Sequence, residues 1–278
     1  MTPPISGKIF TGSIPKLYQE HLVPMMFESY ALDLAQRLTS SLSAKPNAKV
    51  LELAAGTGVV TRHLAALLPS STSITATDLN PAMLAIALHL GTPRAVTWEQ
   101  ADALKLPFPD ASFDAVVCQF GVMFFPDKSK AFSEARRVLK PGGVLLFNVW
   151  DKIEENEFPH TVHKALAELY PSNPSHFMTR APHGYYDQEV IARDLKLAGF
   201  SAPPQFTTRT IRSHAASAHI PAVAFCQGTP MRGEIEVRDP TATGLTQAID
   251  AAEKALIQRF GAGAIDGKIQ GFVVSVAG

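Results

Sequence analysis

The chain has 278 residues, of which 25 are basic and 25 acidic, so its formal net charge is zero. This balance argues against nucleic acid as a partner, because contacts with phosphates require a basic surface. No apolar run approaches the roughly 20 residues that a membrane-spanning helix needs, and the length suits one α/β domain with an added lid and a large core.

The two cysteines favour a reducing compartment. Cys118 and Cys226 make neither a disulfide framework nor a zinc-binding spacing. Residues 1–10 lack the apolar core of a signal peptide. We therefore expect a soluble, cytoplasmic protein with no bound metal, and the oligomeric state is left open.

Residues 1–47 predict an N-terminal helical cap. Residues 1–15 are rich in Pro, Gly and Ser, which is typical of a mobile or draped arm. Over residues 16–42, apolar side chains recur at steps of three and four, which predicts one or two helices broken near Pro24. A loop then leads into the first strand.

A strand, a turn of small residues and a helix follow one another from Lys49. Residues 50–53 indicate a buried strand, and residues 54–58 a bend whose backbone a ligand can approach closely. Thr61 occupies the place of the third glycine in a dinucleotide fingerprint, and no Gly-Lys-Ser/Thr of a phosphate-binding loop follows. Alone, the bend also fits a strand-to-helix turn without a ligand.

Strands and helices then alternate regularly, which favours a parallel, doubly wound sheet. Asn80 and Asp127 are suitable N-terminal caps of two helices, and Gly91 and the run 140–143 are suitable ends. The expected further strands lie over residues 73–78, 95–99, 113–119 and 144–149.

The pattern changes after the fifth strand. Scattered histidines and prolines over residues 151–186 predict an inserted helical lid, and Asp187 is suited to cap a helix that ends at Gly199. A C-terminal excursion is expected over residues 213–269. It follows a strand near 205–212, contains a helix over 246–259 and leads to a final strand over 268–276.

Four consecutive strand ends carry groups suited to a nucleoside. Parallel strands end at one edge of the sheet, where ligands of open α/β folds bind. Asp78 can accept hydrogen bonds from both ribose hydroxyls, although it also fits a charge at a helix start. Asp102 can accept the exocyclic amine of adenine or cap its own loop. The ends in question carry Glu52 with the bend, Asp78, Asp102 with Ala103, and Gln119 with Phe120.

Four runs in this order resemble the motifs of the class I S-adenosylmethionine-dependent methyltransferases. The resemblance covers about residues 48–150 and is closest to the small-molecule branch, type 11, that includes quinone-biosynthesis methyltransferases. Ala54 departs from the glycine that the family often has, a minimal change that we expect to preserve the bend. The runs are residues 50–58, 77–84, 100–114 and 134–143.

The resemblance implies a domain over residues 48–278 with a Rossmann-like, seven-stranded sheet that is mostly parallel and has an antiparallel last strand. It implies S-adenosyl-L-methionine as the cofactor and methyl transfer to a small-molecule acceptor by in-line displacement. The alternatives are a nicotinamide-dependent oxidoreductase, which the missing glycine opposes, and a non-catalytic relative that binds the cofactor.

By the same resemblance, Asp78 binds the ribose, Leu79 and Met83 flank the adenine, and Asp102 and Ala103 meet its edge. Backbone groups near Ala54 and Gln119 bind the amino group of the methionine part. The full set of expected cofactor-binding residues is Tyr18, Glu52, Ala54, Ala55, Gly56, Gly58, Asp78, Leu79, Met83, Asp102, Ala103, Gln119 and Phe120.

Residues that act on the acceptor have no motif. Tyr18, His21 and His176 are candidate catalytic residues, with His160 and His163 as further candidate bases, but a surface or structural role is the stronger interpretation of each histidine. The candidates for the lining of an apolar acceptor pocket are Phe120, Met123, Phe124 and Phe125, and plain core packing is the alternative for Phe124 and Phe125.

Overall fold

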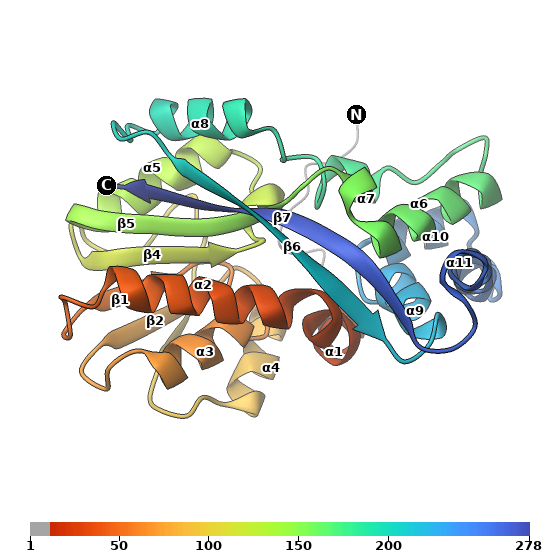
Figure 1. Cartoon of the computed structure of the whole chain (residues 1–278), viewed down its shortest axis with the longest axis horizontal. Coiled ribbons are helices and arrows are strands. Elements are labelled where there is room, and N and C mark those ends of the chain that lie inside the picture. Colours follow the sequence, from red (N-terminus) through yellow and green to blue (C-terminus); the bar gives the residue numbers. More distant parts are fainter. Residues whose placement is uncertain (1–11) are drawn as a thin grey trace.

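The computed structural model describes residues 12–278, so most of the expected arm over 1–15 lies outside the described residues. Seven strands form one sheet in the order β3-β2-β1-β4-β5-β7-β6 (Figure 1). Strands β1 to β5 pair in parallel, and β7 is antiparallel to both β5 and β6, which confirms the predicted fold. The strands are β1 Lys49–Glu52, β2 Ser73–Asp78, β3 Thr97–Gln100, β4 Phe113–Gln119, β5 Leu139–Trp150, β6 Gln205–Ala215 and β7 Ile265–Ala277.

Helices cover both faces of the central strands, as the apolar sequences of β1 and β4 require. Helices α2, α3 and α4 lie on one side, and α5 and α8 on the other (Figure 1). The predicted caps are confirmed, because Asn80, Asp127 and Asp187 each accept a hydrogen bond from a backbone N–H of the first turn. The bounds are α2 Glu28–Ser41, α3 Val59–Leu67, α4 Pro81–Leu90, α5 Lys128–Val138 and α8 Gln188–Leu197.

Two sequence expectations about element boundaries are wrong. Helical structure runs without a break past Pro24, through α1 Ile14–Leu17 and the widened turns of η2 Tyr18–Phe27 into α2. A widened helix tolerates the missing N–H of proline. Strand β5 begins at Leu139, and the run 140–143 belongs to it. Leu139 pairs with Phe113 of β4, and the register shifts before pairing resumes, so Gly142 at φ 72° bends the strand without ending it.

Strands β6 and β7 extend beyond the rest of the sheet. Residues 271–277 of β7 pair with β5, whereas residues 265–270 pair with β6 alone. This two-stranded ribbon carries a helical lobe, in which α6 packs against α11 and β7 (Figure 1). The lobe consists of α6 Glu157–Leu169, α7 Phe177–Arg180, α9 His219–Gln227, α10 Met231–Arg238 and α11 Gly244–Phe260. The two expected additions, 151–186 and 213–269, thus lie together.

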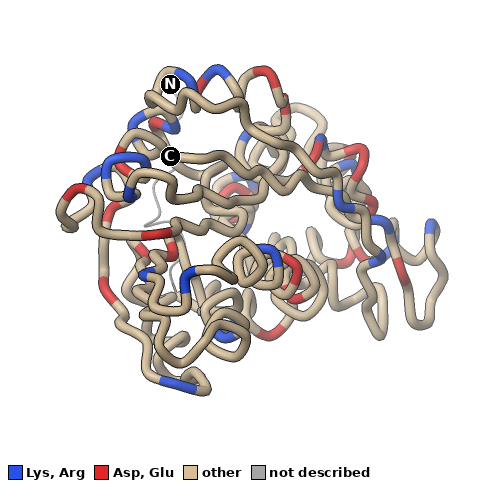
Figure 2. The backbone as a smooth tube through the Cα atoms, turned by 60° about the vertical axis from the view of Figure 1, so that its left-hand side comes forward, with Lys and Arg blue, Asp and Glu red and all other residues tan. Residues whose placement is uncertain are grey.

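Charges are interspersed over the molecule. Figure 2 shows basic and acidic positions mixed along the chain, with no large region of one sign. Over residues 12–278, the structure has no helix with the length and apolar character needed to cross a bilayer. Both cysteines are free and buried.

A buried tyrosine joins the N-terminal helices to the far edge of the sheet. The Tyr30 hydroxyl on α2 donates a 2.6 Å hydrogen bond to the backbone carbonyl of Arg209 on β6. Its ring meets those of Phe120 and Trp150 edge-on, each at 5.1 Å between centroids. Helix α2 is therefore anchored to two distant parts of the sheet.

We expect Tyr30→Phe to lower the free energy of unfolding by about 1–3 kcal/mol, because the Arg209 carbonyl loses a buried donor. Urea denaturation measures the change. Tyr186→Phe is the matched control, since the Tyr186 side chain is 42% exposed. Equal stability of the two variants would contradict an anchoring role for the Tyr30 hydroxyl.

Candidate functional site

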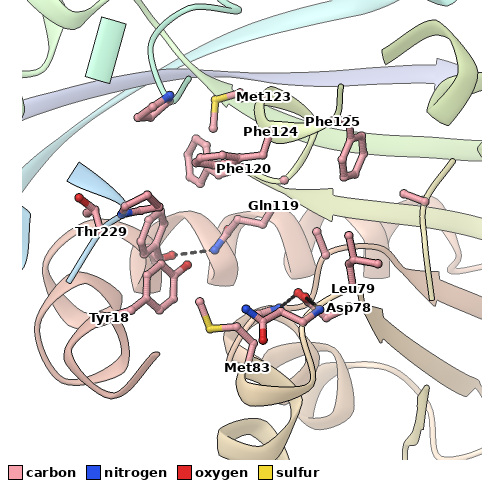
Figure 3. A pocket seen from close by; sticks show the side chains of 18 of the residues that line it. Tyr18, Asp78, Leu79, Met83, Gln119, Phe120, Met123, Phe124, Phe125 and Thr229 are labelled. Atoms are coloured by element: carbon pink, nitrogen blue, oxygen red, sulfur yellow. Dashed lines mark hydrogen bonds between the residues drawn. The ribbon is translucent and has the colours of Figure 1, made fainter. Parts of the chain in front are cut away.

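A cavity of ≈ 300 Å³ opens at the carboxyl ends of β1 to β4, where the strand order reverses between β1 and β4 (Figure 3). One wall comes from the loops after β1, β2 and β3 and holds the carboxylates Asp78 and Asp102. The opposite wall comes from η2, the loop after β4, the end of β5 and the helical lobe, and its side chains are mostly apolar. Parallel strands place ligand sites at this edge.

The bend after β1 has an unusual backbone. Ala54, Gly56 and Gly58 have φ angles of 52°, 58° and 82°. The left-handed region disfavours residues with a Cβ, so Ala54 is strained where glycine would not be. Gly121 accommodates the Ala54 methyl, because a Cβ at Gly121 would lie 2.5 Å from that of Ala54 and 2.8 Å from Sγ of Cys118. The departure at Ala54 is thus matched by a glycine 67 residues later.

Asp78 lies against this bend at the end of β2. One carboxylate oxygen accepts a 2.7 Å hydrogen bond from the Gly56 N–H, and the other accepts a 2.8 Å bond from the Asn80 N–H. Burial raises the pKa of Asp78, and the two N–H donors oppose this rise. A carboxylate has about four acceptor positions, so Asp78 keeps capacity for further donors on the cavity side (Figure 3).

Glu52 lies behind the bend and outside the cavity lining. Its side chain is 1% exposed and accepts a 2.6 Å hydrogen bond from the Thr61 hydroxyl of α3. Its backbone carbonyl accepts a 2.8 Å bond from the Thr77 hydroxyl of β2. Burial raises the pKa of the Glu52 carboxyl to about 8, against the opposing effect of the Thr61 hydrogen bond. Glu52 therefore ties β1 to its neighbours and does not reach the cavity.

The end of β4 supplies two further groups. The Gln119 amide donates to the Phe27 carbonyl at 3.3 Å, and its buried Oε1 has no partner among residues 12–278 (Figure 3). Phe120 has φ 49°, a rare angle for a bulky residue. Its N–H donates to the Asn148 side chain at 2.9 Å, and its ring stacks on Trp150 at 3.8 Å between centroids. Strain of this kind concentrates at functional sites.

The structure brings most of the predicted cofactor-binding residues into one lining. Glu52, Ala55 and Gly58 lie outside it. Asp102 lines the cavity and also closes its own turn, since it accepts a 2.9 Å hydrogen bond from the Leu104 N–H. The predicted residues that line the cavity are Tyr18, Ala54, Gly56, Asp78, Leu79, Met83, Asp102, Ala103, Gln119 and Phe120.

Of the predicted catalytic candidates, Tyr18 lines the cavity and stacks on Phe27 at 5.1 Å between centroids. Burial raises the pKa of its hydroxyl. His21 and His176 lie outside the lining. Met123, Phe124 and Phe125 lie in it with Phe120. Sequence reasoning missed the lining residues Met26, Phe27, Trp150, Phe177, Met178, His183, Phe225 and Thr229, which share no local motif.

Comparisons with known proteins agree with this geometry. Residues 51–147 match the family model described as a methyltransferase domain. The ubiquinone/menaquinone biosynthesis C-methyltransferase of Ectopseudomonas mendocina is 37% identical over 53% of this chain and 57% of its own length. That of Stutzerimonas stutzeri is 32% identical over 60% of this chain and 71% of its own length. The chain thus spans little more than half the length of the first of these relatives.

A solved structure extends the comparison to nearly the whole chain. Haemonchus contortus phosphoethanolamine N-methyltransferase 2, in complex with S-adenosyl-L-methionine, superposes with a TM-score of 0.59 at 18% identity. The match covers 98% of this chain and 60% of that one. At this identity the likeness shows the fold alone.

The contact between Ala54 and Gly121 is testable by a double-mutant cycle. We expect Gly121→Ala to lower the free energy of unfolding by about 1–3 kcal/mol, as overpacking does. The loss should be smaller in an Ala54→Gly background, because one of the two close neighbours is then absent. Gly263→Ala is the control, since its Cβ would meet nothing within 4 Å. Strictly additive effects in urea denaturation would refute the coupling.

The raised pKa of Glu52 predicts a pH-dependent stability. Between pH 4.5 and about 8 the unfolded carboxyl is ionised while the folded one holds its proton, so its contribution to stability falls as the pH rises. Glu52→Gln cannot ionise and keeps an acceptor for Thr61. From pH 5 to pH 8 we expect the variant to gain more than about 1 kcal/mol on the wild type, since one pKa unit corresponds to about 1.4 kcal/mol.

Denaturation at pH 5, 6.5 and 8 measures this difference. Glu168→Gln is the matched control, because that side chain is exposed. Parallel pH curves for the Glu52 variant and the wild type would contradict the proton uptake at Glu52.

Proposed function

We propose that this chain, which belongs to the class I S-adenosylmethionine-dependent methyltransferases, transfers a methyl group from that cofactor to a small-molecule acceptor. The observation that carries the proposal is the continuity of the cavity. A wall with carboxylates and small residues at the strand ends meets an apolar wall in the same space. Methyl transfer requires that the donor and the acceptor bind next to each other, and these two walls provide adjacent binding sites.

The strand-end wall suits S-adenosyl-L-methionine, which supplies a methyl group activated by a sulfonium. Asp78 is held by two backbone donors, and its remaining acceptor positions suit the ribose hydroxyls. The Oε1 of Gln119, which has no partner in the described part of the chain, suits the ammonium of the methionine part. Gly56 leaves open space beside the bend, because a Cβ there would meet nothing within 4 Å. In this proposal, Leu79 and Met83 flank the adenine ring.

Adenine recognition uses the loop after β3. Asp102 accepts the exocyclic amine with an acceptor position that the Leu104 N–H does not use, and Ala103 lines the same edge. Tyr18 and Phe120 border the space between this half and the apolar half (Figure 3). Glu52, Ala55 and Gly58 support the bend from behind in this proposal.

The chain's own contribution to the reaction is alignment and exclusion of water. Correct orientation of two reactants is worth about 7–11 kcal/mol of the barrier. The apolar wall combines rings from η2, the loop after β4, the end of β5 and the helical lobe, so an acceptor held there is shielded from solvent. The first relatives are named for C-methylation in ubiquinone and menaquinone biosynthesis, and an apolar acceptor suits this wall.

Family membership favours methyl transfer over the nicotinamide-dependent alternative. The non-catalytic alternative predicts cofactor binding without turnover. Incubation with cofactor labelled in its methyl group and a fractionated metabolite extract separates the two: transfer of label to any small molecule supports the proposal. Calorimetry with S-adenosyl-L-homocysteine comes first. Folded protein that does not bind it would reject both methyl transfer and non-catalytic cofactor binding.

Asp78→Ala should weaken binding of S-adenosyl-L-homocysteine by about 1–3 kcal/mol, the range for the loss of a charged hydrogen-bond partner. Calorimetry measures the affinity, and thermal unfolding confirms that the variant is folded. Asp250→Ala is the control, because Asp250 is exposed on α11 and outside the cavity lining. An unchanged affinity would contradict the proposed role of Asp78 in ribose binding.

A further inference from the structure

His183 is the one histidine among the described residues that line the cavity. The hydrogen-bond partner of its Nδ1 shows which ring nitrogen carries the proton. Nδ1 lies 2.8 Å from the backbone oxygen of Asp151. A carbonyl oxygen only accepts hydrogen bonds, so Nδ1 carries the proton. In the neutral ring, Nε2 is therefore unprotonated and offers a lone pair.

The ring is held firmly in this orientation. The His183 N–H donates to the Met178 carbonyl at 2.9 Å, which closes a turn after α7. Gly184 is required there, since a Cβ would lie 2.4 Å from the Arg180 carbonyl oxygen. The Asp151 backbone is fixed as well, because its N–H donates to the Gln270 carbonyl of β7 at 3.0 Å. The lone pair on Nε2 thus has a defined position.

The surroundings of His183 in the cavity are apolar. Its ring centroid lies 6.2 Å from that of Trp150. Among the described lining residues there is no Lys, Arg or Glu, and the carboxylates Asp78 and Asp102 belong to the strand-end wall. The apolar wall includes Met26, Phe27, Met123, Phe177, Met178 and Phe225. Among the described residues, this wall therefore has no Lys, Arg, Asp or Glu side chain that would neutralise a charged methyl acceptor.

We propose that the acceptor is a neutral, largely apolar molecule with a hydroxyl group, and that Nε2 of His183 receives the hydrogen bond and then the proton of that hydroxyl. This inference rests on the proposed methyl transfer and names its acceptor class and its base. His183 replaces His21 and His176, which lie outside the lining, in that role.

The step balances with groups already named. The acceptor oxygen forms a bond to the methyl carbon, and the bond from that carbon to sulfur breaks and leaves its electron pair on sulfur. The O–H proton passes to Nε2, and the imidazolium returns it to water after the product leaves. Burial lowers the pKa of His183 to about 4, so the ring is neutral at pH 7. A weak base suffices, because the hydroxyl proton becomes strongly acidic as its oxygen is alkylated.

The test measures recognition of a hydroxyl separately from turnover. Protein saturated with S-adenosyl-L-homocysteine is titrated with 2-naphthol and with 2-methoxynaphthalene, which differ by the O–H donor. His183→Asn is the informative variant, since an asparagine amide can still donate to Asp151 but offers nothing at the place of Nε2. His163→Gln is the matched control, because His163 lies on α6 outside the cavity lining.

We expect the wild type and H163Q to bind 2-naphthol about tenfold more tightly than its methyl ether, the effect of one good hydrogen bond. H183N should lose this preference and keep its affinity for S-adenosyl-L-homocysteine. In wild-type protein with ¹⁵N-labelled histidine, 2-naphthol should shift the Nε2 resonance of His183. This shift of the Nε2 resonance tests the proposal in the wild type even if H183N does not fold.

Equal affinities for the two naphthalenes in the wild type, failure of both to bind, or a preference that survives in H183N would overturn the assignment of His183 and its acceptor class. None of these results affects cofactor binding. Failure of the wild type to bind S-adenosyl-L-homocysteine would instead reject the proposed function itself.

Discussion

The strained backbone of Phe120 is the constraint on which the rest of the site depends. A phenylalanine at φ 49° persists because Asn148, fully buried in β5, accepts its N–H and because Trp150 stacks on its ring. This conformation turns the chain sharply at the end of β4. The turn places Gly121 against Ala54, so the bends after β1 and β4 fit together across the switch point of the sheet.

The same residue links the two halves of the cavity. On one side, Gln119 lines the same cavity as the strand-end wall, in which the bend holds Asp78. On the other side, Phe120 joins Phe27, Tyr30 and Trp150 in an aromatic cluster shared by η2, α2, the loop after β4 and β5. A change in this cluster would thus affect both halves, although its rings come from distant parts of the chain.

Local signals predicted the doubly wound part well. The strands 73–78 and 113–119 have the expected bounds, and Asn80, Asp127 and Asp187 cap helices as expected, because short-range patterns decide such features. The prediction was wrong at Pro24, where the widened turns of η2 accommodate the missing N–H, and at Leu139, where pairing with Phe113 starts β5 early. At Leu139 a tertiary contact outweighed a local stop signal.

The sequence by itself determined the family, the order of the elements and the acidic residues at the strand ends, because motifs and periodicity are local in the chain. The tertiary structure decided what surrounds the acceptor. His183, Trp150 and Phe225 meet at one cavity through a ribbon of β6 and β7 that brings the helical lobe back to the sheet. Their meeting, like the fit of Ala54 to Gly121, depends on contacts between residues far apart in sequence, which no local pattern records.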